Sequence, residues 1–65
     1  MKITLNGDFI ETDSSSLEEL LNSLNYDAEK VATAINGEFV ASVLRGDTKL
    51  CENDAIDVIA PMAGG

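Results

Sequence analysis

The sequence predicts an α+β fold in which one helix packs across a mixed sheet of four or five strands. Two Asn-Gly pairs each stand between short segments of alternating apolar and polar residues, a pattern typical of β-hairpins. One group of leucines has the spacing of an amphipathic helix, and a final apolar run is typical of a central strand. With 65 residues, 45% hydrophobic and 25% charged, the chain has the size and composition of one small globular domain.

The first hairpin is predicted over residues 2–11, around the pair Asn6-Gly7. An Asn-Gly pair favours a two-residue turn because both residues adopt positive φ readily. Such a turn sets residues of the two strands opposite one another, in the pairs Leu5 with Asp8, Ile3 with Ile10, and Lys2 with Glu11. The apolar side chains of both strands then share one face, and the pair of opposite charges lies on the other face.

A helix is predicted after this hairpin, since residues 13–16 are a cluster of side chains that cap helices. Ser16 with Glu19 has the spacing of a capping box, as does the pair one residue earlier. The apolar stripe of this helix consists of four leucines, namely Leu17, Leu20, Leu21 and Leu24. Asn25 follows the stripe directly, so we expect the helix to stop there.

The second half of the chain is predicted to return to the sheet. A third strand over residues 31–35 runs into the second Asn-Gly pair and then into a short strand over 38–40. The segment after it is less regular, with a turn expected at Arg45-Gly46-Asp47 and a candidate short strand over 48–50. The last strand, residues 55–59, is apolar enough to be central in a sheet.

A hairpin, a helix and returning strands in this order predict the β-grasp architecture, a two-layer α+β sandwich. The globular domain is expected to cover residues 1–59. Residues 60–65 are expected to form a flexible, extended tail.

The charge and the residue inventory exclude several classes of function. Twelve acidic residues against four basic ones give a net charge of −8, which disfavours nucleic-acid and anionic membrane partners and favours electropositive protein surfaces. Histidine is absent, which excludes Ser/His/Asp and Cys/His triads and removes the commonest metal ligand. No apolar run approaches the roughly 18 residues of a membrane span, and no secretion signal is recognisable, so a cytoplasmic protein is expected.

The sequence that carries chemistry is its end, Ala60-Pro61-Met62-Ala63-Gly64-Gly65. A carboxylate becomes an acylating group once ATP has converted it to a mixed anhydride, but it must first enter the narrow site of another enzyme. Glycine at both final positions removes the side chains that would block entry. Pro61 restricts its own φ and biases Ala60 toward extended backbone. A C-terminal segment that is restricted at its start and free of side chains at its end is what a carrier or modifier protein needs.

These features together resemble the ThiS family, the small ubiquitin-like sulfur carriers of thiamine biosynthesis. The resemblance covers the opening strand and turn (2–8), the Leu-Glu-Glu-Leu-Leu segment (17–21), the strand-turn-strand segment (31–40), the last turn and strand (52–59) and Gly64-Gly65. Two positions depart from the family pattern. Asn53 stands where glycine is common, and residues 41–44 do not clearly match the family's helical turn.

The resemblance implies a protein cosubstrate and not a catalyst, with no cofactor and no metal bound. An E1-like, ThiF-type adenylyltransferase would activate the Gly65 carboxylate with ATP, and a cysteine-derived persulfide would convert it to a thiocarboxylate. A ThiG-type thiazole synthase would then take the sulfur. Pro61, Met62, Ala63 and Gly64 would thread into these partners. Two alternatives stay open: sulfur supply to molybdopterin or tungsten-cofactor synthesis, and a ubiquitin-like modifier or interaction module.

Four other signals have simpler structural explanations. Cys51, the one cysteine, reads as a core or edge residue of a strand. Asp13-Ser14-Ser15 resembles the modified serine site of acyl carrier proteins, but a helix cap explains it. Arg45-Gly46-Asp47 matches an adhesion tripeptide and reads as a surface turn. The many carboxylates lack the spacing of a calcium loop and read as a solvated acidic face.

Overall fold

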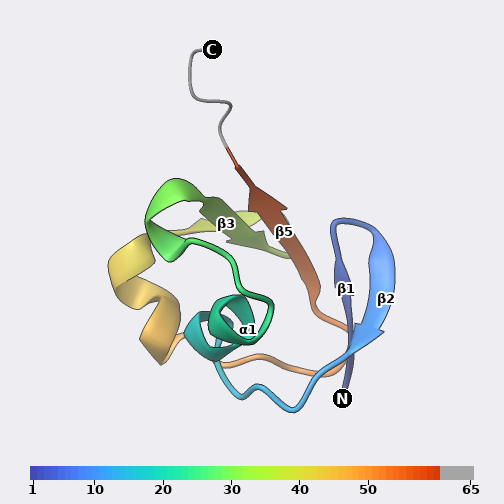
Figure 1. The fold of residues 1–65 in the computed structure, drawn as a ribbon. Coiled ribbons are helices and arrows are strands. Elements are labelled where there is room, and N and C mark those ends of the chain that lie inside the picture. Colours follow the sequence, from blue (N-terminus) through green and yellow to red (C-terminus); the bar gives the residue numbers. More distant parts are fainter. Residues whose placement is uncertain (61–65) are drawn as a thin grey trace.

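The computed structural model describes residues 1–60, and the predicted tail residues 61–65 lie outside the described part. Figure 1 shows α1 on one side of a twisted sheet, and β5 running through that sheet toward the C-terminal end of the chain. The strands are β1 (Lys2–Leu5), β2 (Asp8–Glu11), β3 (Ala32–Ile35), β4 (Glu38–Val40) and β5 (Ala55–Ile59). The helices are α1 (Leu17–Ser23) and the 3-10 helices η1 (Ala28–Lys30) and η2 (Ser42–Asp47).

The strands form one mixed sheet with the order β2-β1-β5-β3-β4. β1 and β5 pair in parallel, and the other neighbours pair antiparallel. This arrangement confirms the predicted α+β fold of the β-grasp type, with the last strand in the centre of the sheet. None of the helices formed by residues 1–60 is long and apolar enough to cross a membrane.

Both Asn-Gly pairs form the predicted turns. Asn6 and Gly7 have φ of 51° and 89°, and Asn36 and Gly37 have φ of 52° and 85°. The first turn produces the expected register of β1 against β2, including Ile3 opposite Ile10. Positive φ at two successive residues gives a turn whose twist matches that of the strands, which explains why a short local motif determines the whole hairpin.

Helix α1 is capped at both ends by its own sequence. The Ser16 hydroxyl accepts a hydrogen bond from the Glu19 N–H at 3.2 Å, and the Glu19 carboxylate accepts one from the Ser15 N–H at 3.1 Å. The predicted capping box therefore forms, with the return bond shifted to the residue before the cap. At the other end Asn25 has φ of 61°, and the N–H of Tyr26 donates to the carbonyl of Leu21, as in a Schellman motif.

We expect the substitution Ser16→Ala to lower the free energy of unfolding by about 1 kcal/mol, because it leaves the Glu19 N–H without its capping acceptor. Urea unfolding followed by circular dichroism measures this change. Ser15→Ala is the matched control, since the exposed Ser15 hydroxyl contacts only the Glu19 side chain. An equal loss of stability in both variants would contradict the assignment of Ser16 as the cap.

The hydrophobic core lies between α1 and the sheet. Its buried apolar members come from β1, β5, α1 and the segment before β5, and they are Ile3, Leu17, Leu20, Leu21, Leu50, Ile56 and Val58. Leu24, the fourth leucine of the predicted stripe, is 39% exposed. It lies outside this core because α1 ends at Ser23 and Leu24 is already the C-cap residue.

The segment between β4 and β5 differs from the sequence prediction. Residues 42–47 form the 3-10 helix η2, so a helical turn is present where none was clearly recognised. The candidate strand over 48–50 is reduced to an isolated bridge between Lys49 and Ser16. Asn53 has φ of 71° in the last turn, as its tolerance of left-handed backbone allows.

Arg45 contradicts the prediction of a surface turn at Arg45-Gly46-Asp47, because its side chain is only 4% exposed. The guanidinium donates to the carbonyls of Ala28 and Val31, both at 2.8 Å, and to the Thr33 hydroxyl at 3.1 Å. A planar group with five donors satisfies these three acceptors at once, which explains how a charge is accommodated in the interior. It joins η2 to η1 and β3.

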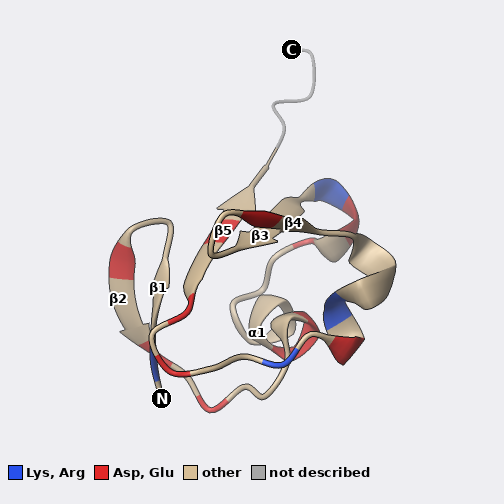
Figure 2. Cartoon of the chain, turned by 180° about the vertical axis from the view of Figure 1, so that it is seen from behind, with Lys and Arg blue, Asp and Glu red and all other residues tan. Residues whose placement is uncertain are grey.

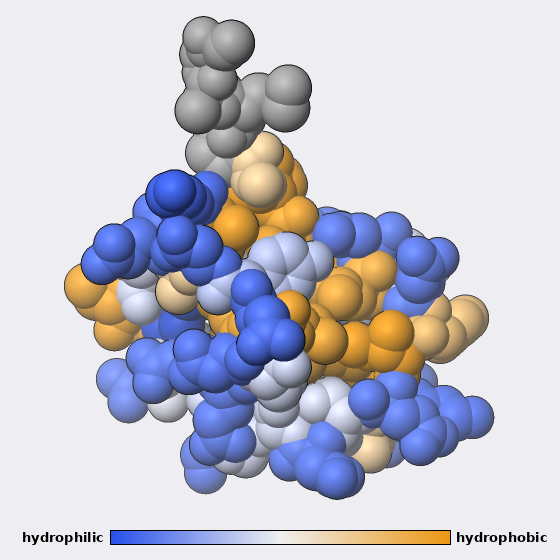
Figure 3. Space-filling model, in the orientation of Figure 1, coloured by the Kyte–Doolittle hydropathy of each residue, from blue (hydrophilic) through white to orange (hydrophobic). Residues whose placement is uncertain are grey.

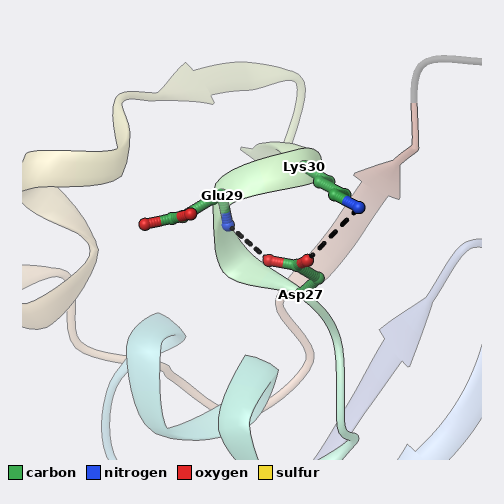
Figure 4. A network of polar contacts seen from close by, with 3 residues as sticks. All are labelled: Asp27, Glu29 and Lys30. Carbon is green, nitrogen blue, oxygen red and sulfur yellow. Dashed lines mark hydrogen bonds and ion pairs between the residues drawn. The ribbon is translucent and has the colours of Figure 1, made fainter. Parts of the chain in front are cut away.

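The short helix η1 begins with a local polar network (Figure 4). The Asp27 carboxylate accepts a hydrogen bond from the Glu29 N–H at 3.2 Å and lies 3.9 Å from the Lys30 ammonium. Both side chains of the ion pair are largely exposed, so the pair itself adds little stability. The hydrogen bond from the Glu29 N–H to Asp27 caps η1 and helps to determine where this helix begins. It thereby helps to place the Ala28 carbonyl that Arg45 binds.

Candidate functional site

The described part of the candidate site is strand β5 with its neighbours. β5 ends at Ile59, directly before the predicted tail. The predicted site residues Pro61, Met62, Ala63, Gly64 and Gly65 lie outside the described residues. The structure therefore describes the strand that precedes the predicted tail, and the chemistry expected of the tail rests on the sequence.

Both edges of β5 are held by other strands. On one side β5 pairs in parallel with β1, and on the other it pairs antiparallel with β3 as far as the pair Ala32 and Ile59. Its side chains alternate, with Ile56 and Val58 buried under α1. A central strand with a buried face is among the last parts of a small domain to open, so the start of the tail is firmly anchored.

The face of the sheet opposite α1, which we call the open sheet face, carries large apolar side chains. The register places Phe9, Phe39 and Ile59 together on this face, on β2, β4 and β5 respectively. These side chains are 79%, 73% and 62% exposed. Smaller residues (Thr4, Ala34 and Ala55) occupy the strand positions between them. Large exposed apolar side chains on one face are typical of a protein-binding surface.

Figure 3 shows the face seen in Figure 1, where apolar residues gather below the end of β5 and hydrophilic residues surround them. Figure 2 shows acidic residues on β2, on β5 and next to the strands β3 and β4, with few basic residues among them. On the open sheet face, Asp57 lies beside Ala34 in the register. The surface near the start of the tail thus combines apolar contact area with negative charge, which suits an electropositive partner.

Residues 1–60 contain no group of three His, Cys, Asp or Glu side chains arranged to hold a metal ion. A depression between α1, η1 and η2 is lined by apolar side chains, by Glu18 and Glu29, and by Arg45. Each nitrogen of the Arg45 guanidinium already donates to an acceptor of the protein. This depression is therefore explained by the packing of the short helices.

The remaining sequence candidates take up structural roles. Ser14 is buried, Ser16 caps α1, and the β-grasp fold is not the helical bundle of an acyl carrier protein. The adhesion hypothesis is wrong because Arg45 is buried. The prediction that Cys51 is a core or edge residue of a strand is wrong, because Cys51 is exposed in the turn before β5, where its N–H donates to the Asp54 carboxylate at 2.8 Å.

The open sheet face is a surface feature that the sequence predictions did not include. A signal for it was present in both hairpins. Phe9 and Ile10 are adjacent apolar residues in one strand, as are Phe39 and Val40 in another, and successive residues of a strand point to opposite faces. One member of each pair must therefore face away from the core.

A comparison with models of protein families shows which family this chain is related to. The model of the ThiS family matches residues 3–65, almost the whole chain and its final Gly-Gly pair. The chain belongs to the ThiS family. The ThiS match therefore includes all the predicted site residues, from Pro61 to Gly65.

Two solved structures of proteins from Geobacter metallireducens are similar to this ThiS chain over its entire length. The crystal structure of a thiamine biosynthesis protein (ThiS) is 32% identical, covers 100% of both chains and has a TM-score of 0.85. An NMR solution structure of a thiamine biosynthesis protein is 30% identical, covers 100% of this chain and 88% of that one, and has a TM-score of 0.80. A comparison with curated proteins yielded no match.

Proposed function

We propose that this chain is a sulfur carrier of thiamine biosynthesis that carries sulfur as a thiocarboxylate on Gly65. The observation that carries the proposal is the ThiS family match, which extends through Gly64-Gly65. The similar structures, both of thiamine biosynthesis proteins, support the same pathway. The described residues agree with a carrier, because they form a rigid β-grasp body with an apolar surface beside the start of the tail.

The proposed chemistry takes place in the sites of partner enzymes. A Gly65 carboxylate oxygen attacks the α-phosphorus of ATP in an E1-like, ThiF-type enzyme, and pyrophosphate leaves. The terminal sulfur of a cysteine-derived persulfide then attacks the acyl carbon, and AMP leaves. A thiol breaks the resulting S–S bond and releases the thiocarboxylate, whose sulfur a ThiG-type thiazole synthase takes. The chain itself supplies the acyl group and its presentation, and ATP belongs to the activating enzyme.

Presentation is the physical contribution of this chain. A reaction between two proteins is faster when the reacting group starts from a fixed position, because less freedom is lost on reaching the site. The buried face of β5 fixes that starting position. In this proposal the activating enzyme contacts the open sheet face through Phe9, Phe39 and Ile59 while the tail enters its active site.

Intact-mass analysis of the chain co-expressed with its activating enzyme tests the proposal. We expect a fraction of the protein to gain the mass difference between sulfur and oxygen, and that gain to map to the C-terminal peptide. Co-expression with an activating enzyme that cannot bind ATP is the control. Absence of the mass gain with the active enzyme would contradict the carrier function.

The same preparation distinguishes the alternatives. Thiocarboxylated protein is incubated with thiazole synthase or with the large subunit of molybdopterin synthase, and loss of sulfur from the carrier is followed by mass. We expect the carrier to lose its sulfur to thiazole synthase and to keep it in the presence of the molybdopterin synthase subunit. Sulfur loss to the molybdopterin enzyme would assign the chain to another sulfur pathway, and conjugates to lysines of other proteins would indicate a modifier.

A further inference from the structure

The side chains of the two Asn-Gly turns both bind strand β5. The Asn6 side-chain oxygen accepts a hydrogen bond from the Val58 N–H at 2.8 Å, and the Asn36 side-chain oxygen accepts one from the Ala55 N–H at 2.9 Å. Turn formation needs only positive φ at these positions, which glycine also provides. The contacts with β5 are therefore an additional property of the two asparagine side chains.

The Asn6 contact continues the pairing of β1 with β5 by one step. Along this edge the Thr4 N–H donates to the carbonyl of Asp54 and the Asn6 N–H to the carbonyl of Ile56, both at 2.9 Å. The next donor of β5 on this side is the Val58 N–H. The backbone of β1 has already turned away, since Asn6 has φ of 51°, and its side-chain oxygen supplies the acceptor instead.

This bond lies next to the end of β5. Only Ile59 separates Val58 from the predicted tail, which starts at Ala60, whereas Ala55 is the first residue of the strand. On the other side β5 is held by β3 up to the pair Ala32 and Ile59. Without the Asn6 side chain, the final part of β5 would be hydrogen-bonded along that one edge.

We infer that Asn6 is a positioning residue for the carrier reaction: its side-chain amide oxygen fixes the end of β5 from which the reactive tail starts. The inference rests on the proposed function. A tail that starts from a fixed strand loses less freedom when Gly65 enters a partner site, so Asn6 lowers the concentration of carrier that the activating enzyme needs. Asn36 holds the opposite end of the strand and has no such effect.

Three variants separate this role from general stability. Asn6→Gly keeps the turn and removes the acceptor, because glycine adopts positive φ without strain. Asn6→Asp keeps both the turn and an acceptor oxygen. Asn36→Gly is the matched control, since Asn36 has nearly the same φ as Asn6 and is also exposed. Its side-chain oxygen accepts from the Ala55 N–H, and its side-chain amide donates to Asp54, the residue before β5.

The experiment combines amide hydrogen exchange by NMR with the kinetics of ATP-dependent activation by a ThiF-type enzyme. For Asn6→Gly we expect the Val58 amide to exchange about tenfold faster, since a half-buried N–H has lost its acceptor. We also expect the KM for the carrier to rise about tenfold at unchanged kcat, through the lost positioning. Asn6→Asp restores both values. Asn36→Gly speeds exchange at Ala55 and leaves the KM within about twofold of the original.

Three results would overturn the inference. An unchanged KM in Asn6→Gly excludes a positioning role, and an equal rise in Asn36→Gly shows that the effect comes from loss of stability. Unchanged exchange at Val58 shows that the bond does not hold the strand. Failure of the unmodified chain to be activated contradicts the proposed function instead, and the exchange data then still decide whether Asn6 holds the end of β5.

Discussion

Removal of Gly64 and Gly65 is expected to abolish thiocarboxylate formation and to leave the free energy of unfolding unchanged. The shortened chain still ends in a carboxylate, on Ala63, but that group falls short of the ATP by two residues, each spanning about 3.5 Å when extended. The core is unaffected because its members along the described chain reach only to Val58. Intact-mass analysis after activation measures the first effect, and urea unfolding measures the second.

The matched control is a chain lengthened by one alanine after Gly65. It retains every residue of the tail but moves the carboxylate away from Gly65, so we expect the same loss of thiocarboxylate. A full yield from either variant would show that the enzyme does not require the carboxylate at Gly65. A large loss of stability on truncation would show instead that the final glycines belong to the folded body.

The substitution Arg45→Met is expected to lower the free energy of unfolding by about 3 kcal/mol, since it removes three hydrogen bonds from a charged donor and leaves partly buried acceptors unpaired. Arg45→Lys is expected to recover little of this loss. An ammonium is a compact group that cannot present the planar fork required by two carbonyls and a hydroxyl. Urea unfolding of both variants, with the transition slope checked for constancy, measures the effect.

Lys30→Met is the control for the loss of a positive charge. Lys30 is exposed and its ion pair with Asp27 is long, so we expect a change below about 0.5 kcal/mol. Equal stabilities for the Arg45 and Lys30 variants would show that η2 does not depend on the guanidinium contacts.

Local signals were sufficient for much of this fold. Asn6-Gly7 predicted a turn and thereby a register that pairs Ile3 with Ile10, since a two-residue turn leaves one alignment of the strands. Ser16 and Asn25 predicted the two ends of α1 for similar reasons, because a cap involves residues within one turn of the helix. The segment before β5 was predicted poorly, since η2 has neither a leucine stripe nor a side-chain cap.

The sequence by itself determined the class of the fold, the two hairpin turns with the register of the first, and the limits of the helix, and its Gly-Gly pair is the basis of the proposed chemistry. Each depends on neighbours along the chain or on covalent structure. Tertiary structure alone decided that Arg45 is buried, that Phe9 and Phe39 share an open face with Ile59, and that Asn6 binds Val58 from 52 residues away. Such contacts form only when distant segments pack together, and no local pattern encodes which side chain meets which backbone group.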